Sequence, residues 1–289
     1  MKKTKEKEIN NLDVKSKEKE TSVEDVKIEI KDKTKKKKRK GAYQCFFKRF
    51  FDISISLIGI LVLSPIFILV SLLSLILLPG NPILKQYRPG KDNKIFTLYK
   101  FRSMTNKKDK DGNLLPDKDR ITFWGKIIRK TSIDELPQLF NILKGDMSIV
   151  GPRPRLVKDL VFYREEVLAA NTVRPGITGP AQVYDPGSQG TWESVFARDI
   201  EYANNVTFKN DLKLFFGTFA AVFKNRSASG AEENSEKREY YYPDQLLKDN
   251  EISKEQYDKG LELAKKLKVN QKIEYSPELR EKENNPKDE

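Results

Sequence analysis

The longest apolar run of the chain covers residues 53–78, which contain no charged side chain and have basic residues on both sides. As a helix, these 26 residues would extend about 39 Å, which exceeds the roughly 30 Å hydrocarbon core of a bilayer. The run is too long for a secretory signal peptide, and no small-residue cleavage pattern follows it. The pattern therefore predicts a helix embedded in a membrane.

Ser64 and Pro65 lie in the middle of this run. Pro65 would remove the main-chain hydrogen bond to Leu61, and the Ser64 hydroxyl can return a bond to that turn, which makes a break tolerable inside lipid. A spanning helix would also export one basic flank, against the positive-inside rule, whereas a hairpin bent here keeps both flanks in the cytoplasm. Prolines also occur in spanning helices, so from these residues alone both topologies remain open.

Shorter patterns after the membrane segment predict a small folded domain. β-Branched and aromatic residues predict a strand over 94–104. Helices are predicted over 121–130, over 133–144 with an end at Gly145, and over 155–170. Prolines and glycines predict an extended stretch over 146–155 and a loop over 173–179.

Two further helical patterns lie toward the C-terminus. Residues 207–224 place apolar side chains at helical spacing between lysines, which predicts an amphipathic helix. Such a face packs on a protein core or docks at a membrane interface, and the neighbouring membrane segment favours the interface. Residues 245–268 predict two short amphipathic helices around Asn250, similar to the helical-hairpin modules at bacterial C-termini, with protein contact as their use.

Composition narrows the chemistry. The 289 residues include no histidine and one cysteine, and carry a net charge of +13. Without histidine, Ser/His/Asp and Cys/His catalysis and the common histidine-containing zinc sites are excluded, so acid–base chemistry must use Asp, Glu, Lys or Tyr. The single cysteine, Cys45, cannot form an internal disulfide and is interpreted as a small apolar residue beside the membrane segment.

Basic charge is concentrated just before the apolar run. Seven of the eight residues 33–40 are Lys or Arg, within a polar N-terminal arm too poor in apolar residues to fold. Alone, such a cluster fits either nucleic acid or an anionic membrane surface. Because a membrane segment follows, we interpret the cluster as a juxtamembrane segment that binds anionic lipid, and we expect no nucleic-acid partner.

The adjacent carboxylates of Asp134 and Glu135 are the strongest candidates for catalysis. Neighbouring acids suit metal-assisted phosphoryl transfer, in which one acts as ligand or nucleophile and the other positions it. The alternative is a capping box that begins at Ser132, although Pro137 would delete a main-chain bond one turn in. Basic side chains near glycines and prolines are candidates for gripping phosphates, although any one of them alone could be a surface charge: Arg129, Lys130, Arg153, Arg155 and Arg174.

The order of motifs resembles the bacterial sugar transferase family, the monotopic phosphoglycosyl transferases, over residues 46–224. The carrying motifs are Ser64-Pro65, KFRSM (100–104), RKTSIDELPQLFNILKGDMSIVGPRP (129–154) and VRPGITG (173–179). The resemblance implies an enzyme on the cytoplasmic face of the bacterial inner membrane. It would transfer a sugar-1-phosphate from a UDP-sugar to polyprenyl (undecaprenyl) phosphate with Mg²⁺ as cofactor, releasing UMP. This is the first membrane step of capsule, exopolysaccharide, O-antigen or glycoprotein assembly.

The resemblance also implies roles for single residues. Asp134 would be the nucleophile, through an aspartyl phosphosugar intermediate, and a metal ligand, with Glu135 in support. The expected substrate-binding residues are Lys100, Arg102, Arg129, Pro152, Arg153, Pro154, Arg174, Asp199 and Tyr202. The chain departs from the family's usual pattern at residues 180–187, which leaves sugar recognition open. An inactive paralogue or a membrane-bound scaffold that presents the basic arm and C-terminal hairpin therefore stays as the alternative.

The expected fold is α/β and predominantly helical, with a re-entrant membrane helix, interfacial amphipathic helices and a small cytoplasmic catalytic domain. The expected boundaries are a disordered polybasic arm (1–45), a membrane hairpin (46–84), a catalytic domain (85–226), a linker (227–244), a short helical hairpin (245–268) and a disordered tail (269–289).

Overall fold

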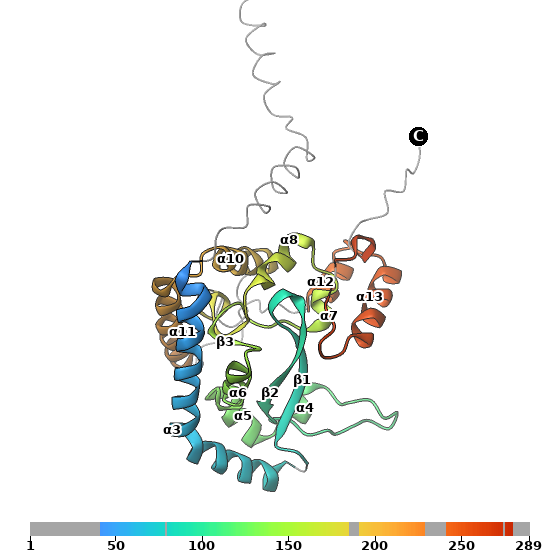
Figure 1. Cartoon of the computed structure of the whole chain (residues 1–289). Helices are drawn as coiled ribbons and strands as arrows, with labels where there is room; N and C mark the ends of the chain where they lie inside the picture. The colour runs from blue at the N-terminus through green and yellow to red at the C-terminus, as the bar shows by residue number, and fades with distance from the viewer. Residues whose placement is uncertain (1–40, 79, 185–190, 229–240, 274, 280–289) are drawn as a thin grey trace, which may run out of the picture. The chain divides into compact units, whose positions relative to one another are not determined.

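The computed structural model describes residues 41–78, 80–184, 191–228, 241–273 and 275–279. Most of these residues are helical, and two small two-stranded sheets accompany the helices (Figure 1). Most of the predicted arm (1–45) and of the predicted linker (227–244), and about half of the predicted tail (269–289), lie outside the described residues.

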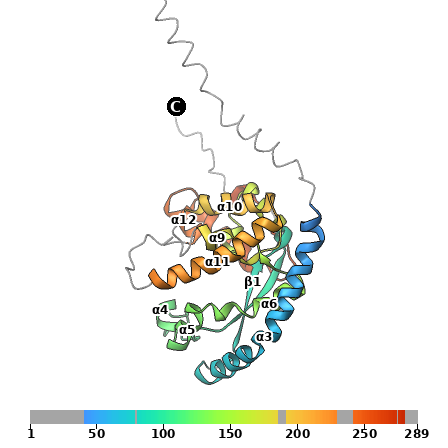
Figure 2. The same ribbon diagram turned by 90° about the vertical axis from the view of Figure 1, so that its left-hand side faces the viewer.

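The apolar run forms one long helix. A short π-helix, η1 (Tyr43–Phe47), continues into α3 (Lys48–Leu77), and together they are long and apolar enough to cross a membrane. Pro65 lies inside α3, and the Ser64 hydroxyl donates a 2.8 Å hydrogen bond to the Leu61 carbonyl, as the sequence predicted. Figures 1 and 2 both show that α3 bends within its length instead of running straight.

The first sheet is an antiparallel hairpin of β1 (Ile83–Pro89) and β2 (Ile95–Phe101). The predicted strand over 94–104 is confirmed as β2, whereas β1 was not predicted. The hairpin turns through η2 (Lys91–Asn93), where Asp92 and Asn93 adopt left-handed φ angles of 55° and 59°. These are residue types that tolerate this conformation in tight turns.

The second sheet pairs β3 (Ser148–Val150) with β4 (Gly176–Thr178) in parallel. The prediction of a loop over 173–179 is therefore wrong for its central residues. Glycines explain the pairing, because a Cβ on Gly176 would lie 2.1 Å from the Gly151 nitrogen, and one on Gly179 would lie 2.0 Å from the Gly151 oxygen. Only glycine lets the two backbones approach this closely.

Short helices surround the two sheets. The predicted helix over 121–130 is confirmed as α5, whose N-cap Thr122 accepts a bond from the Gly125 nitrogen. The helices between β2 and β4 are α4 (Asp117–Arg120), α5 (Phe123–Lys130), η3 (Ile133–Glu135), α6 (Gln138–Lys144), α7 (Val157–Leu160), α8 (Glu165–Leu168) and η4 (Ala169–Thr172). The predicted helix over 155–170 is wrong as a single element, because residues 160–163 are all buried, which one face of a helix cannot achieve.

The remaining helices follow β4 along the chain. They are α9 (Pro180–Tyr184), α10 (Trp192–Asn204), α11 (Phe208–Ala228), α12 (Tyr242–Lys248), α13 (Lys254–Lys266) and η6 (Pro277–Leu279). The segments predicted as a linker and as a disordered tail both contain folded residues. Tyr242, in the predicted linker, starts α12, and Ile273 and Leu279, in the predicted tail, are buried. These isolated apolar residues gave no periodicity, yet Ile273 and Leu279 both belong to a buried apolar cluster.

Three apolar clusters position the elements around the candidate site. One joins α7, α10 and the C-terminal helices, a second joins β2, α6 and β3, and a third joins α3 to β2 and α5 through Val70, Phe101 and Ile128. Because α3 also lies against α6 (Figure 2), the membrane helix packs directly on the folded unit.

Candidate active site

Asp134 and Glu135 lie in η3, the single turn between α5 and α6. Ser132, which the capping-box alternative requires as a cap, adopts a left-handed φ of 59° and forms no side-chain cap hydrogen bond. The two carboxylates therefore do not serve a cap made by Ser132, and their grouping needs another explanation.

Glu135 is held by cations from two other elements. Lys100 at the end of β2 donates a 2.7 Å hydrogen bond to the Glu135 carboxylate, and Arg153, in the loop after β3, donates one of 2.9 Å to the same oxygen. Burial alone would raise the pKa of Glu135, but the charges of Arg153 and Lys100 outweigh it and lower the pKa to about 2. Glu135 thus stays ionised and fixes both cations.

Asp134 has a different environment. Its carboxylate forms no hydrogen bond with any other residue that the structure describes. Burial raises the pKa of Asp134 above the usual range and the charge of Glu135 adds to this, while the charges of Lys100, Arg129 and Arg153 oppose it. Two neighbouring carboxylates therefore differ, since one is tied to cations and the other keeps its oxygens available for a ligand or a reaction.

Arg129 reaches the site because α5 packs tightly on the segment after β2. A Cβ on Gly125 would lie 1.8 Å from the Ser103 carbonyl oxygen, so only glycine allows this contact. The Arg129 Nε donates a 2.7 Å hydrogen bond to the Ser103 hydroxyl, which orients the guanidinium group. Arg102, in the same segment, has its guanidinium beside Gly80, 2.9 Å from where a Cβ would lie.

The structure brings five of the predicted site residues into one cluster: Asp134, Glu135, Lys100, Arg129 and Arg153. Pro152 and Pro154 flank Arg153 in the sequence. Three other predicted residues have contacts elsewhere. The Arg174 Nε donates 2.8 Å to the Gly145 carbonyl at the far end of α6. Asp199 pairs with Arg155 at 3.2 Å, and the buried Tyr202 hydroxyl donates to the Val150 carbonyl at 2.9 Å. Their roles in donor binding stay predictions.

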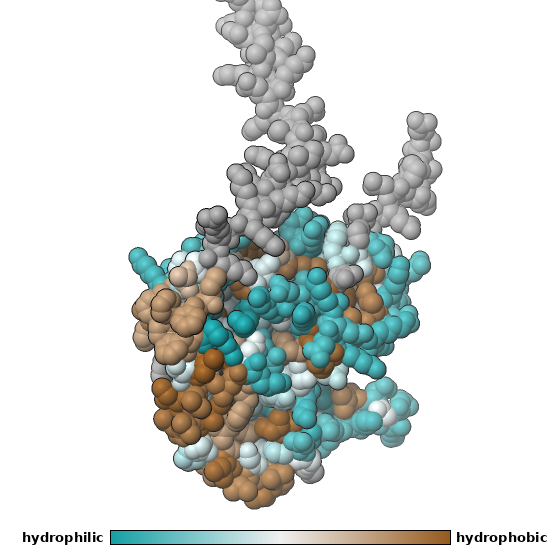
Figure 3. Space-filling view, in the orientation of Figure 1, coloured by the Kyte–Doolittle hydropathy of each residue, from teal (hydrophilic) through white to brown (hydrophobic). Residues whose placement is uncertain are grey.

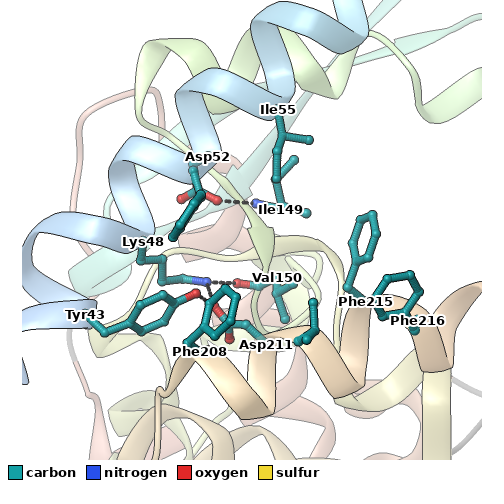
Figure 4. A pocket seen from close by; sticks show the side chains of 12 residues that line it. Tyr43, Lys48, Asp52, Ile55, Ile149, Val150, Phe208, Asp211, Phe215 and Phe216 are labelled. Atoms are coloured by element: carbon teal, nitrogen blue, oxygen red, sulfur yellow. Dashed lines mark hydrogen bonds and ion pairs between the residues drawn. The ribbon is translucent and has the colours of Figure 1, made fainter.

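A second polar cluster, which sequence reasoning missed, joins α3 to β3 and α11 (Figure 4). Lys48 pairs with Asp211 and donates 2.9 Å to the Val150 carbonyl, and the Tyr43 hydroxyl donates 2.7 Å to Asp211. Asp52 accepts a 2.9 Å bond from the Ile149 nitrogen. The available signal was the presence of acids inside apolar patterns, where an unpaired charge is costly.

An apolar pocket opens beside this cluster (Figure 4). Its walls include Phe51, Ile55, Leu212, Phe215 and Phe216, from α3 and α11. Of the charged residues that line it, Lys48 pairs with Asp211, and Asp52 accepts hydrogen bonds from Ser148 and Ile149. The rest of the lining is mainly apolar, so the pocket suits hydrocarbon.

A broad apolar surface continues from this pocket along α3. Figure 3 shows apolar side chains gathered over this helix. Exposed apolar residues of neighbouring helices extend it, namely Phe123 of α5, Phe140 of α6, and Phe208, Leu212 and Phe216 of α11. Phe123 is 81% exposed and Ile76 of α3 is 76% exposed, values that a water-soluble surface of this extent rarely shows.

The donor set for a metal is small. Among the described residues, no group of three or more His, Cys, Asp or Glu side chains could hold a metal ion. Mg²⁺, however, commonly takes only one or two protein carboxylates and completes its shell with water and substrate phosphates. Asp134, with its oxygens available, fits such a site.

Comparison with known proteins places these motifs in context. The model of the family described as bacterial sugar transferase matches residues 43–225. "Uncharacterized sugar transferase EpsL" of Bacillus subtilis is 47% identical over 176 residues, which cover 61% of this chain and 86% of that protein.

Two longer relatives carry more specific names. "UDP-glucose:undecaprenyl-phosphate glucose-1-phosphate transferase" of Klebsiella pneumoniae is 38% identical over 191 residues, covering 63% of this chain and 41% of the relative. "Undecaprenyl-phosphate galactose phosphotransferase" of Salmonella typhimurium is 38% identical over 202 residues, covering 63% and 42%. The chain thus spans less than half the length of these two relatives.

Proposed function

Because the chain belongs to the bacterial sugar transferase family, we propose that it transfers a sugar-1-phosphate from a UDP-sugar to undecaprenyl or a related polyprenyl phosphate and releases UMP. The observation that carries the proposal is the convergence of Lys100, Arg129 and Arg153 on the Asp134–Glu135 pair. Cations from separate elements suit a substrate with several phosphate charges. The name of the Klebsiella pneumoniae relative contains both substrates, and the name of the Salmonella typhimurium relative contains the acceptor.

The chemistry divides into two displacements at one phosphorus. An Asp134 oxygen attacks the sugar-linked phosphorus of the UDP-sugar, an oxygen–phosphorus bond forms, and the bond from that phosphorus to the bridging oxygen breaks, so that UMP leaves with this oxygen. A polyprenyl phosphate oxygen then attacks the same phosphorus and frees the carboxylate. The product is a polyprenyl diphosphate sugar, and Asp134 returns unchanged.

The surrounding residues support the attack without reacting. Glu135, paired with Lys100 and Arg153, holds both cations next to Asp134, where they offset phosphate charge. Arg129 presents the remainder of its guanidinium fork while Ser103 holds the Nε. The Asp134 carboxylate, together with substrate phosphates, would hold Mg²⁺, which when bound neutralises charge on the phosphates.

The proposal includes a re-entrant membrane helix with both ends on the cytoplasmic face. Arg49, near the start of α3, donates to the Ile142 carbonyl at 2.6 Å. Ser74, near the end of α3, accepts 3.0 Å from the Trp124 indole. Both halves of α3 thus form hydrogen bonds with the same folded unit. A hairpin allows this, because both of its ends lie on one side of the bilayer. A straight spanning helix does not allow it, because its ends lie on opposite sides. The exposed apolar face of α11 would lie along the interface, and the basic arm would face anionic lipid.

The test is transfer by the full-length protein in membranes. A panel of UDP-sugars is assayed for UMP release, and for transfer of radiolabelled sugar-phosphate to polyprenyl phosphate. The proposal predicts acceptor-dependent transfer from at least one donor, which also identifies the sugar and narrows the glycan pathway. A scaffold or inactive paralogue would release no UMP with any donor.

Arg129→Lys should lower kcat/KM for the UDP-sugar by more than about tenfold, although the charge is kept. Lysine cannot bond Ser103 and a phosphate together through a planar fork, so the charge loses its orientation. Steady-state UMP release measures the effect, and Arg164→Lys, at an exposed arginine, serves as the matched control. If the kinetic constants for both substrates stayed unchanged, Arg129 would not bind a phosphate and would be an ordinary surface charge.

A further inference from the structure

The chain continues beyond the family match, which ends at residue 225, with a folded C-terminal module. We use this name for residues 241–273 and 275–279, which contain α12, α13 and η6. The two helices lie on either side of Asn250, where the sequence predicted them, and Figure 1 shows them beside α7.

The apolar face of this module is covered by its own chain. The Tyr242 ring lies 5.0 Å from the ring of Tyr163 and 5.1 Å from that of Phe196. A Cβ on Gly260 of α13 would lie 2.3 Å from the Phe162 ring, so the helix sits directly on that side chain. The face that the sequence suggested for a protein partner is therefore occupied within the molecule.

The module also forms main-chain hydrogen bonds next to the start of β2, around an isolated antiparallel bridge between Lys94 and Lys272. The Ile95 nitrogen, at the start of β2, donates 2.9 Å to the Gln271 carbonyl, and the Ile273 nitrogen donates 3.0 Å to the Asn93 carbonyl. Main-chain pairing of this kind fixes the position of the module relative to the β1–β2 hairpin.

The module also packs against residues that connect to Asp199, which was predicted to bind the donor. Tyr242 packs at 5.5 Å on the ring of Trp192, and the Arg155 guanidinium lies 5.6 Å from that same ring. Arg155 in turn pairs with Asp199 at 3.2 Å. A chain of contacts therefore runs from the module to the segment that places Arg153 on Glu135.

At the edge of this contact lie four residues, which we name the donor-side cluster: Arg88, Lys158, Asp159 and Tyr241. The Lys158 ammonium lies 3.8 Å from the centre of the exposed Tyr241 ring. In the β1–β2 ladder, Arg88 pairs with Phe96 and Leu84 with Lys100, so Arg88 and Lys100 lie on the same face of the sheet.

Charges and unpaired atoms link this cluster to the candidate active site. Burial lowers the pKa of Arg88 to about 10 and the charge of Arg153 adds to this, while the charges of Asp159 and Glu135 oppose it. The Arg88 Nε and one Asp159 carboxylate oxygen are buried and have no hydrogen-bond partner among the described residues. Buried polar atoms of this kind call for a partner.

We propose that the C-terminal module completes the nucleotide part of the donor site in cis by supplying Tyr241 as an aromatic wall for the base. Outside the module, Arg88 of β1 and Lys158 of α7 would face phosphate, and Asp159 of α7 would face a hydroxyl or N–H group of the nucleoside. This inference rests on the proposed function, since it concerns the same donor. Guanidinium and ammonium groups bind phosphate, a carboxylate accepts from ribose hydroxyls or uracil N–H, and a tyrosine ring stacks on a base.

Tyr241→Ala tests the aromatic wall, with UMP as the probe because every donor of this class contains it. Binding to the full-length, detergent-solubilised protein is measured by calorimetry. The Kd for UMP should rise about tenfold, which corresponds to about 1.4 kcal/mol, and KM for the UDP-sugar should rise while KM for polyprenyl phosphate stays unchanged. Tyr241→Phe should retain wild-type affinity.

Tyr87→Ala is the matched control, because Tyr87 is 51% exposed against 50% for Tyr241 and lies on the other face of β1 from Arg88. It should leave the Kd for UMP unchanged. Equal UMP affinity in Tyr241→Ala and wild type would overturn the inference, as would a wild-type protein that binds no UMP. UMP binding that depends on Tyr241 but without transfer from any UDP-sugar would instead contradict the proposed function.

Gly260→Ala tests the docking of the module without touching the cluster. A methyl group there would strike the Phe162 ring, so Tm should fall and the Kd for UMP should rise. If the module were instead undocked and available to another protein, Gly260→Ala would stabilise α13, because alanine is a better helix former than glycine. Tm would then rise or stay unchanged. That result would overturn docking in cis, and the exposed neighbour, Lys259→Ala, is the control for α13 itself.

Discussion

Asp134→Asn should abolish UMP release, by roughly 10⁴-fold or more, and leave the protein folded. The amide keeps the shape of the side chain but loses the charge that attacks phosphorus and binds a metal ion. Stability should not suffer, because burial raises the pKa of Asp134, so the ionised side chain disfavours the folded state at neutral pH. UMP assays with excess Mg²⁺, together with thermal unfolding, measure both effects.

Glu135→Gln is the matched comparison, and it should differ in stability. The folded-state pKa of Glu135 is lowered to about 2, so its ion pairs stabilise the fold above the unfolded-state pKa of about 4.5 and are lost as the pH falls toward 2. At neutral pH the variant should lose roughly 3 kcal/mol of unfolding free energy as well as most activity, because Lys100 and Arg153 lose their partner. If Asp134→Asn released UMP at the wild-type rate, Asp134 would be excluded as the nucleophile.

Replacing Ser64 and Pro65 together with leucine should move the catalytic unit to the wrong side of the membrane. The substitution restores the main-chain bond that proline removes and gives a continuous apolar run over residues 53–78. The basic N-terminal flank would stay in the cytoplasm, so the helix would carry the rest of the chain across. The contacts of Arg49 with Ile142 and of Trp124 with Ser74 could not both form, and activity should be lost.

Single cysteines in a Cys45-free protein report this change. One is placed in the N-terminal arm and one at Ser227, and intact cells are treated with an impermeant thiol reagent. Both should be shielded in the wild type, and the second should become labelled in the double-leucine variant. Labelling of only one site in the wild type would establish a spanning helix and remove the re-entrant interpretation.

Elements with strong local determinants could be predicted from the sequence. Each of three elements has its determinants within a few neighbouring residues. These are the β-branched and aromatic residues of β2, the apolar face and Thr122 cap of α5, and the left-handed Gly145 that ends α6. The Ser64 bond to Leu61 is equally local. The convergence of Lys100 and Arg153 on Glu135 was visible only as separate motifs, because 35 and 18 positions separate the partners.

What failed depended on distant partners. β4 forms because it pairs with β3, although its own sequence has no apolar alternation. A Pro/Gly-rich segment gives no sign of such a partner. Lys48 and Asp211 are 163 positions apart, and each alone fits a helix flank. The hydrogen bond from Arg174 to the Gly145 carbonyl joins residues 29 positions apart, and nothing in the sequence indicated it; the predicted role of Arg174 in substrate binding stays a prediction. Ile273 is buried by β2 and not by any pattern of its own.

The most direct test of transfer through Asp134 is a reaction without acceptor. The full-length protein is incubated with a UDP-sugar that carries radiolabel in its sugar-linked phosphate, and no polyprenyl phosphate is added. An aspartyl phosphosugar intermediate predicts one UMP released per active molecule and label retained on the peptide that contains Asp134. Added polyprenyl phosphate should then remove the label into lipid. UMP release that occurs only with acceptor present, and no label on the protein at any time, would contradict this mechanism.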